Sequence, residues 1–162
     1  DGRHNFAGAL WARGNCWVTI AIPEFIEMLD LAPGDALRTF LTDALLAQVE
    51  AQARHQDDSG LWHTLIDDPT SYLEASATAG FAYGILKGVR KGYLPRRFEA
   101  VGIRAVKAVL ANIDESGELK QVSFGTPMGH DMQFYKDIPL TSMPYGQSLA
   151  IVALTEFMRT YL

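Results

Sequence analysis

The sequence has little cysteine and no long apolar segment. Cys16 is the single thiol, which excludes an internal disulfide and fits a reducing compartment. Because no His partner is evident, we expect Cys16 to be a small buried side chain rather than a nucleophile. No apolar run approaches the ~18 residues that a membrane span requires, and no signal-peptide pattern is present. We therefore expect no membrane partner and a cytoplasmic location, with the periplasm as the alternative.

Clustered positive charge is also scarce. Acidic residues number 19 against 14 Lys and Arg, giving a net charge of -5. Nucleic-acid binding calls for a clustered basic surface, so we expect no nucleic-acid partner. One short basic group is interpreted as a solvated helix end: Lys87, Arg90, Lys91, Arg96 and Arg97.

Signals for metal, phosphate or Ser–His–Asp chemistry are missing as well. His130 and Asp131 are adjacent, but no second pair lies at a suitable spacing for a metal site. The segment GTPMGHD lacks the lysine and the spacing of a phosphate-binding loop. We therefore expect neither a metal nor another cofactor.

Two similar turns divide the chain into repeats. DDSG at 57–60 and DESG at 114–117 each follow a helical pattern and precede a strand-like segment, LWHTLID or ELKQVSF. Asp, Ser and Gly are turn-forming residues, since Gly takes positive φ cheaply and Asp or Ser bonds the local backbone. Their repeat of 57 residues (114 minus 57) is the length of two helices with connections. This indicates stacked helical hairpins.

Apolar periodicity and capping residues predict five helices. Asn15 is the expected N-cap of the first, in which Pro23 predicts a kink or a late start. Ser71 with Glu74 forms a capping box at the start of the third, whose small residues ASATAGFAYG suit close packing. The last is apolar on nearly every side, so deep burial is expected. The expected ranges are about 16–30, 35–55, 71–91, 95–113 and 145–162. One long loop, at 125–143, is expected between the last two helices.

An odd number of helices indicates an array that opens in the middle of a hairpin. Helices with apolar residues on both sides require further neighbours. The sequence therefore predicts an all-α fold, an arc of a helical toroid, with residues 1–162 forming one part of a single domain. The start at Asp1, without methionine, is a hint of a preceding segment.

The stretch WARGNCW, residues 11–17, is the main candidate site. A helix start presents unpaired N–H groups that favour an anion, and Arg13 adds a planar fork matched to a carboxylate. Trp11 and Trp17 supply flat faces for the C–H side of a sugar ring. This combination predicts a uronic-acid site. The alternative is that both tryptophans belong to the core and Arg13 caps a neighbouring helix.

Weaker candidates lie further along the chain. Trp62 and His63 follow the first turn, and in an extended segment only one of them can point at a given pocket. The loop at 124–139 is long enough to suggest function. Among nearby carboxylates, Glu74 is interpreted as a cap, and Asp67 with Asp68 as part of a turn.

Four motifs in this order resemble the C-terminal half of glycoside hydrolase family 105, the unsaturated rhamnogalacturonyl hydrolases. They are WARGNCW, GLWHTLID with SYLEASATAGFAYGILKGVRKGYL, SFGTPMG, and PYGQSLAIVALTEF. The resemblance implies about half of an (α/α)6 barrel. It also implies hydration of the 4,5 double bond of a terminal unsaturated uronic acid, with an aspartic acid as proton donor and then base.

The resemblance implies substrate binding rather than catalysis by these residues. Trp11, Arg13 and Trp17 match the motif that holds the unsaturated uronic acid, and Trp62 with His63 match a loop on the same rim. The family's catalytic aspartate lies upstream of these motifs, so we assign no catalytic residue and expect the chain alone to be inactive. Two alternatives stay open: a family 88 unsaturated glucuronyl hydrolase acting on glycosaminoglycan fragments, and a non-catalytic all-α carbohydrate-binding or scaffold module. Exposed apolar stripes on a half barrel predict self-association.

Overall fold

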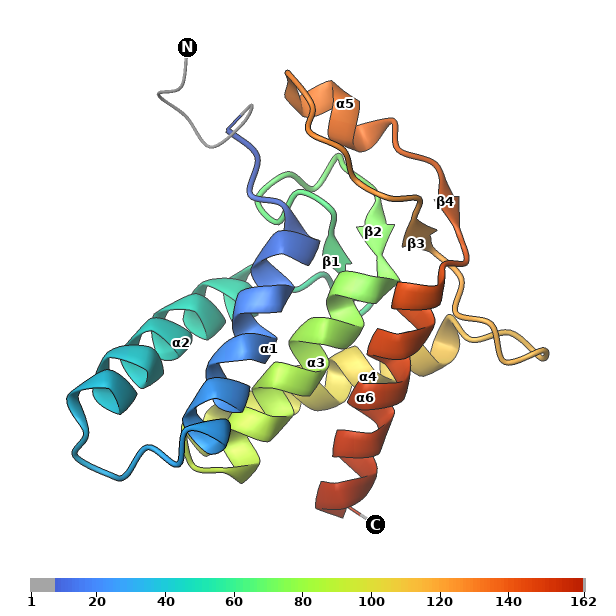
Figure 1. The fold of residues 1–162 in the computed structure, drawn as a ribbon. Coiled ribbons are helices and arrows are strands. Elements are labelled where there is room, and N and C mark those ends of the chain that lie inside the picture. Colours follow the sequence, from blue (N-terminus) through green and yellow to red (C-terminus); the bar gives the residue numbers. More distant parts are fainter. Residues whose placement is uncertain (1–7, 162) are drawn as a thin grey trace.

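The computed structural model describes residues 8–161 and is mainly helical (Figure 1). The long helices are α1 (Ala12–Met28), α2 (Ala36–Arg54), α3 (Ala75–Arg90), α4 (Glu99–Ala111) and α6 (Pro144–Tyr161). A 3-10 turn, η1 (Arg96–Phe98), leads into α4, and α5 (Met132–Lys136) is a single short turn. The strands form two antiparallel pairs, β1 (Trp62–His63) with β2 (Leu73–Glu74) and β3 (Val122–Ser123) with β4 (Leu140–Thr141).

The helices form two layers. α1, α3 and α6 lie side by side and form the first layer (Figure 1). α2 packs beside α1, and α4 packs behind α3 (Figure 1). The three helices of the first layer run in the same direction. Their N-terminal ends therefore meet at one end of the molecule, where the strand pairs and α5 also lie (Figure 1). The expected all-α arc of hairpins is confirmed, and the layer brings three helix starts together.

Small residues let α3 sit at the centre of the layer. A Cβ atom on Gly84 would lie 2.3 Å from the carbonyl oxygen of Thr19, and one on Gly80 would lie 2.7 Å from Cys16 Sγ. These contacts set the close approach of α1 and α3, as the small-residue segment predicted. Cys16 is fully buried there, and burial raises the pKa of its thiol well above the usual range. A buried, non-nucleophilic Cys16 agrees with the expectation.

Helix starts show both correct and wrong predictions. Asp35 caps α2, accepting hydrogen bonds from the N–H groups of Leu37 and Arg38. Asn15, however, lies inside α1, where its side-chain amide donates to the carbonyl of Trp11. α1 begins earlier than expected because WARGN forms its first turn, with Pro23 well inside the helix.

The start of α3 is set by Glu74 and not by Ser71. The Glu74 carboxylate accepts a hydrogen bond of 2.6 Å from the N–H of Ala77. Ser71 instead belongs to the preceding loop, where its hydroxyl donates to the carbonyl of Asp68. The expected capping box is therefore wrong in detail, although the interpretation of Glu74 as a cap is confirmed.

The two repeated turns have the same backbone construction. Asp57 accepts from the N–H of Ser59 at 2.9 Å, and Asp114 accepts from the N–H of Ser116 at 3.0 Å. Gly60 and Gly117 take φ values of 89° and 86°, the left-handed region that favours glycine. Each turn leads out of a second-layer helix toward the next first-layer helix, so the 57-residue repeat is structural.

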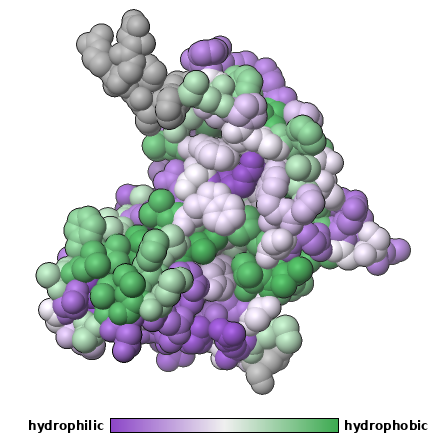
Figure 2. Space-filling view, viewed as in Figure 1, coloured by the Kyte–Doolittle hydropathy of each residue, from purple (hydrophilic) through white to green (hydrophobic). Residues whose placement is uncertain are grey.

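Both flanks of the arc carry exposed apolar side chains. The expected deep burial of the last helix is wrong, because Ile151 on α6 is 58% exposed and Met158 is also exposed. α1 likewise exposes Val18 and Phe25. Figure 2 shows a broad hydrophobic area over α1 and α2 at the lower left. These stripes face outward because no further helix of residues 8–161 packs against the flanks.

The basic group is not a solvated helix end throughout. Lys87 is buried and pairs with Glu24 and Glu27, Lys91 pairs with Glu27, and Arg90 pairs with the buried Glu156. These acids come from α1 and α6, so the positive side chains bridge three helices. Across residues 8–161, no helix is both long and apolar enough to cross a membrane.

Candidate functional site

Arg13 lies where the N-terminal ends of α1, α3 and α6 meet. Its side chain projects from the first turn of α1 and is only 5% exposed. Nη1 donates to Ser123 Oγ at 2.7 Å and to the Tyr145 hydroxyl at 3.1 Å, and Nη2 donates to Thr126 Oγ1 at 2.6 Å. The guanidinium therefore ties α1 to β3, to the following segment and to α6.

Two aromatic rings bracket this guanidinium. Its central carbon lies 5.2 Å from the centroid of Trp11 and 4.5 Å from that of Tyr145. Both distances are within the ~6 Å range of cation–π attraction. The Tyr145 hydroxyl also accepts from the N–H of Gly125 at 3.1 Å and donates to the carbonyl of Ser123. Arg13 is thus a positive charge of fixed orientation in a nearly dry setting.

Glu74 balances the charge of Arg13. One of its oxygens lies 3.7 Å from Arg13 Nη1 and accepts hydrogen bonds from Ser76 Oγ at 2.7 Å and from the N–H of Ser123 at 3.0 Å. The other oxygen caps α3. Both oxygens of this fully buried carboxylate are therefore occupied, which is what a buried ion pair requires to be tolerated. Glu74 holds the site together and has no oxygen free to act on a substrate.

Trp17 forms the exposed wall of a neighbouring cavity. The ring is 47% exposed and lies one turn further along α1 than Arg13. The cavity between α1 and α6 has a volume of about 390 Å³, and its other lining residues are Ile20, Glu24, Tyr83, Tyr145, Ser148, Leu149 and Val152. This cavity combines aromatic and aliphatic surface with a carboxylate and three hydroxyl groups, the composition suited to a sugar ring.

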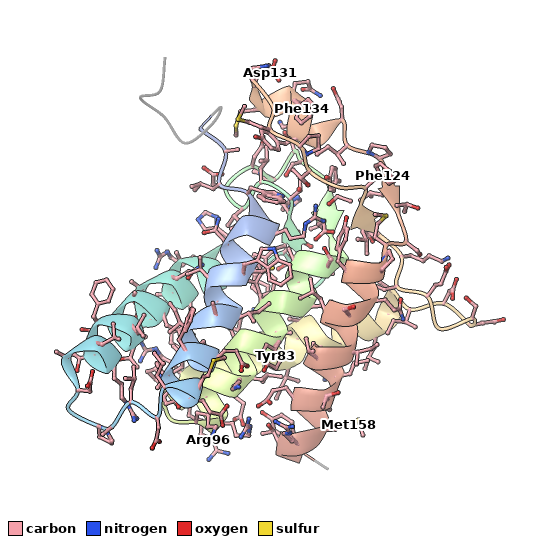
Figure 3. All side chains as sticks on the ribbon, in the orientation of Figure 1. Tyr83, Arg96, Phe124, Asp131, Phe134 and Met158 are labelled. Atoms are coloured by element: carbon pink, nitrogen blue, oxygen red, sulfur yellow. The ribbon has the colours of Figure 1, made fainter. Side chains whose placement is uncertain are left out.

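A charged group fixes the polar side of this cavity. The Tyr83 hydroxyl donates to Glu24, and Lys87 Nζ donates to Glu24 Oε1 at 2.5 Å. Burial, followed by the hydrogen bond to Glu24, raises the pKa of Tyr83. Tyr83 therefore keeps its proton at neutral pH, and Figure 3 shows where it lies on α3 in the middle of the first layer.

The other two predicted site residues lie elsewhere. Trp62 is fully buried, packs edge-on against Phe81 with centroids 5.0 Å apart, and donates its indole N–H to the carbonyl of Gln52. No part of this ring is available to a sugar. His63 Nδ1 lies 2.5 Å from the carbonyl oxygen of Ser71, so that nitrogen carries the proton.

His63 lies on β1, and its side chain contacts Ser71 and the first turn rather than the Arg13 group. Its Nε2 lies 3.8 Å from a carboxylate oxygen of Asp57 in the first turn. Asp131 is likewise structural, since it caps α5 by accepting from the N–H of Phe134 at 2.9 Å. Among residues 8–161, no group of three or more His, Cys, Asp or Glu side chains is arranged to hold a metal ion.

Several residues of the site were not named as individual candidates in the sequence analysis. Ser123 and Thr126 lie in SFGTPMG and Tyr145 in PYGQS, two motifs that carry the resemblance. Tyr83 lies in the motif SYLEASATAGFAYGILKGVRKGYL, whereas Glu24 lies in a helix outside the four motifs. They become recognisable only when α1 and α3 are packed together, because their contact spans 59 positions of the chain.

Solved structures place this arrangement in a known class. The chain superimposes with a TM-score of 0.97 and 60% identity on a possible member of family GH105 from Klebsiella pneumoniae, covering 100% of this chain and 42% of that one. A family 105 glycoside hydrolase from C. acetobutylicum ATCC 824 gives a TM-score of 0.84 and 26% identity, over 93% of this chain and 46% of that one. The class is that of the helical-barrel glycosidases, and this chain forms part of such a barrel.

Sequence comparison assigns the family. The profile of Glycosyl Hydrolase Family 88 matches residues 1–161, so the chain belongs to this family. It is 30% identical over 159 residues to the unsaturated rhamnogalacturonyl hydrolase YesR of Bacillus subtilis, a match that covers 98% of this chain and 44% of that enzyme. The expected resemblance is confirmed, and the chain spans less than half the length of these relatives.

Proposed function

We propose that this chain supplies a substrate-binding wall of an unsaturated rhamnogalacturonyl hydrolase. The observation that carries the proposal is the fixed cation Arg13, bracketed by Trp11 and Tyr145, beside the exposed ring of Trp17. A uronic acid needs a partner for its carboxylate and a flat apolar surface for its ring. The similarity to the B. subtilis enzyme, whose name states this activity, supports the same substrate class.

The hydrogen bonds of Arg13 indicate how a carboxylate would bind. Nη1 is committed to Ser123 and Tyr145, whereas Nη2 donates to the hydroxyl of Thr126. In our proposal a carboxylate oxygen takes the place of the Thr126 hydroxyl on Nη2. The sugar ring then lies against Trp17, with the hydroxyl groups of Tyr83 and Ser148 within the same cavity. His63 is a weaker, rim-side candidate, and Trp62 contributes through packing alone.

The proton donor of the proposed reaction is not assigned to this chain. Hydration of the double bond requires a carboxyl group that protonates one carbon while water adds to its neighbour. Both oxygens of Glu74 are engaged, and Asp131 caps α5. We propose that the acid belongs to the part of the barrel that the relatives have and this chain does not span. On this proposal the chain alone is inactive.

The test uses the ultraviolet absorbance of the substrate's conjugated double bond. An unsaturated galacturonyl-rhamnose disaccharide is given to this chain and to a chimera that joins it to the unmatched part of the Klebsiella protein. We expect loss of absorbance with the chimera only, and at least a hundredfold slower loss when the chimera carries Arg13→Met, a range typical for one strong charged contact. Turnover by the isolated chain would place an acid within it, and an unaffected Arg13→Met chimera would refute the proposed role of Arg13.

A further inference from the structure

The cavity between α1 and α6 shares a wall with the Arg13 group. Tyr145 belongs to both, since its hydroxyl accepts a hydrogen bond from Arg13 Nη1 at 3.1 Å and the same residue lines the cavity. Trp17, Ile20 and Glu24 follow one another at helical spacing along α1 and form the opposite wall. A ligand whose carboxylate reaches Arg13 can therefore also contact the side chains of this cavity.

Two of the three hydroxyl groups of the cavity lie on α6 and donate their hydrogens to backbone carbonyls. Tyr145 donates to the carbonyl of Ser123, and Ser148 donates to the carbonyl of Pro144 at 2.9 Å. A hydroxyl has one hydrogen, so each of these groups can offer a ligand only a lone pair. The Tyr145 oxygen already accepts from Arg13 and from a backbone N–H. Ser148 is therefore the acceptor that α6 contributes.

The third hydroxyl, that of Tyr83 on α3, is committed in the same way (Figure 3). It donates to Glu24 Oε1, and a carboxylate accepts hydrogen bonds but does not donate them. Lys87 Nζ also donates to Glu24 Oε1, at 2.5 Å, and pairs with Glu27 at 2.7 Å. Lys87 is 3% exposed and does not line the cavity. It supplies the counter-charge of Glu24 from behind the wall and presents no donor to a ligand.

We propose that Glu24, Tyr83 and Ser148 form an acceptor wall that selects a sugar ring with free hydroxyl groups and rejects an O-acylated or O-alkylated ring. The inference rests on the proposed function, which places the uronic-acid carboxylate at Arg13. Among the side chains of residues 8–161 that line the cavity, the indole N–H of Trp17 is the remaining donor. An ester or ether oxygen has no hydrogen to donate and would leave the acceptors of the wall unpaired. Removal of O-acyl groups must then precede binding.

Ligand-observed NMR titration of the 162-residue chain measures this selection. The reference ligand is the unsaturated galacturonyl-rhamnose disaccharide, whose uronic ring keeps hydroxyl groups at C2 and C3. It is compared with the 2,3-dideoxy and 2,3-di-O-methyl forms of the same ring. We expect both to bind about tenfold more weakly, the loss of two hydrogen bonds to the wall. The dideoxy form adds no bulk, so its weaker binding reports the hydrogen bonds alone.

Substitutions in the wall should change the preference among these ligands. Tyr83→Phe removes one acceptor, and Glu24→Gln introduces an amide donor of similar shape. Each should reduce the preference for free hydroxyl groups about threefold, and Glu24→Gln should strengthen binding of the methylated ring. Tyr161→Phe removes a matched hydrogen bond, 2.8 Å long, to Glu99 outside the cavity and should retain the full preference. A preference unchanged by both Tyr83→Phe and Glu24→Gln would overturn the inference.

A further ligand separates this inference from the proposed function. The methyl ester of the uronic carboxyl group keeps the ring hydroxyls but removes the charge that Arg13 would bind. Equal binding of the three ring forms, with much weaker binding of the ester, would overturn the acceptor wall and leave the Arg13 site standing. A ring preference with undiminished binding of the ester would support the wall and refute the Arg13 site. No binding of any of these ligands would refute both.

Discussion

α3 and α6 have similar apolar character but very different surroundings. Thirteen of the 16 residues of α3 are buried, against five of the 18 residues of α6. α3 packs against α1 on one side, α6 on the other and α4 behind. α6 has α3 on one side only, and its far side exposes Ile151 and Met158. Position within the layer, and not composition, decides what each helix buries.

Replacing the buried carboxylate that caps α3 and the one within α6 gives the largest expected contrast. Glu74→Ala would leave Arg13 without its counter-ion and two backbone N–H groups without their acceptor, and we expect a loss of about 3–5 kcal/mol in the free energy of unfolding. Glu156→Ala on α6 should cost less than half as much, since its partner Arg90 is 25% exposed in its side chain and can turn to water. Urea unfolding measures both. Equal losses would contradict the view that α3 is the better-enclosed helix.

A single added methyl group tests the close approach of α1 and α3. Gly84→Ala would place a Cβ atom against the carbonyl of Thr19, a backbone atom that cannot rotate away, so we expect a loss of about 2–3 kcal/mol. The matched change on α6 is Ser148→Ala at an exposed position, with an expected effect within about 0.5 kcal/mol. The midpoints of urea unfolding should therefore separate clearly. A neutral Gly84→Ala variant would mean that the two helices can move apart freely.

The exposed flank of α6 predicts self-association of this chain. Three first-layer helices make half of a six-membered ring, so two copies can cover each other's apolar flanks. Changing Ile151 to Glu should weaken association about tenfold, equivalent to ~1.4 kcal/mol. Light scattering over a concentration series provides the measurement, with Glu115→Gln in the exposed second turn as a control away from the flank. A wild-type chain that stays monomeric at high concentration would refute the half-barrel pairing.

Prediction from sequence succeeded where a local pattern determines the structure. The Asp-x-Ser-Gly turns and the small residues of α3 act through neighbouring atoms, and both were recovered. It failed for Asn15 because α1 already begins at Ala12, and for Ser71 because the Glu74 carboxylate caps α3 instead. The burial of Trp62 and the pairing of Glu24 with Tyr83 depend on helices far apart in the chain. No local pattern reports such contacts, so the Arg13 motif was found and most of its partners were not.

Acid should weaken the contact between α1 and α3 through Glu27. Glu27 on α1 receives hydrogen bonds from Lys87 and Lys91, which lower its pKa from an ordinary 4.5 to about 2. A carboxylate with a lower pKa in the folded state stabilises the fold above pH 4.5, and that stabilisation is lost as the pH falls from 4.5 toward 2. Because the Glu27 side chain is 43% exposed, solvent screens the effect and we expect only a small shift in the thermal midpoint. Glu27→Gln should reduce the drop in midpoint between pH 6 and pH 3, while Glu115→Gln, which removes the same charge from an exposed turn, should leave that drop unchanged. Identical drops in the two variants would show that the Lys87 and Lys91 pairs do not hold α1 against α3.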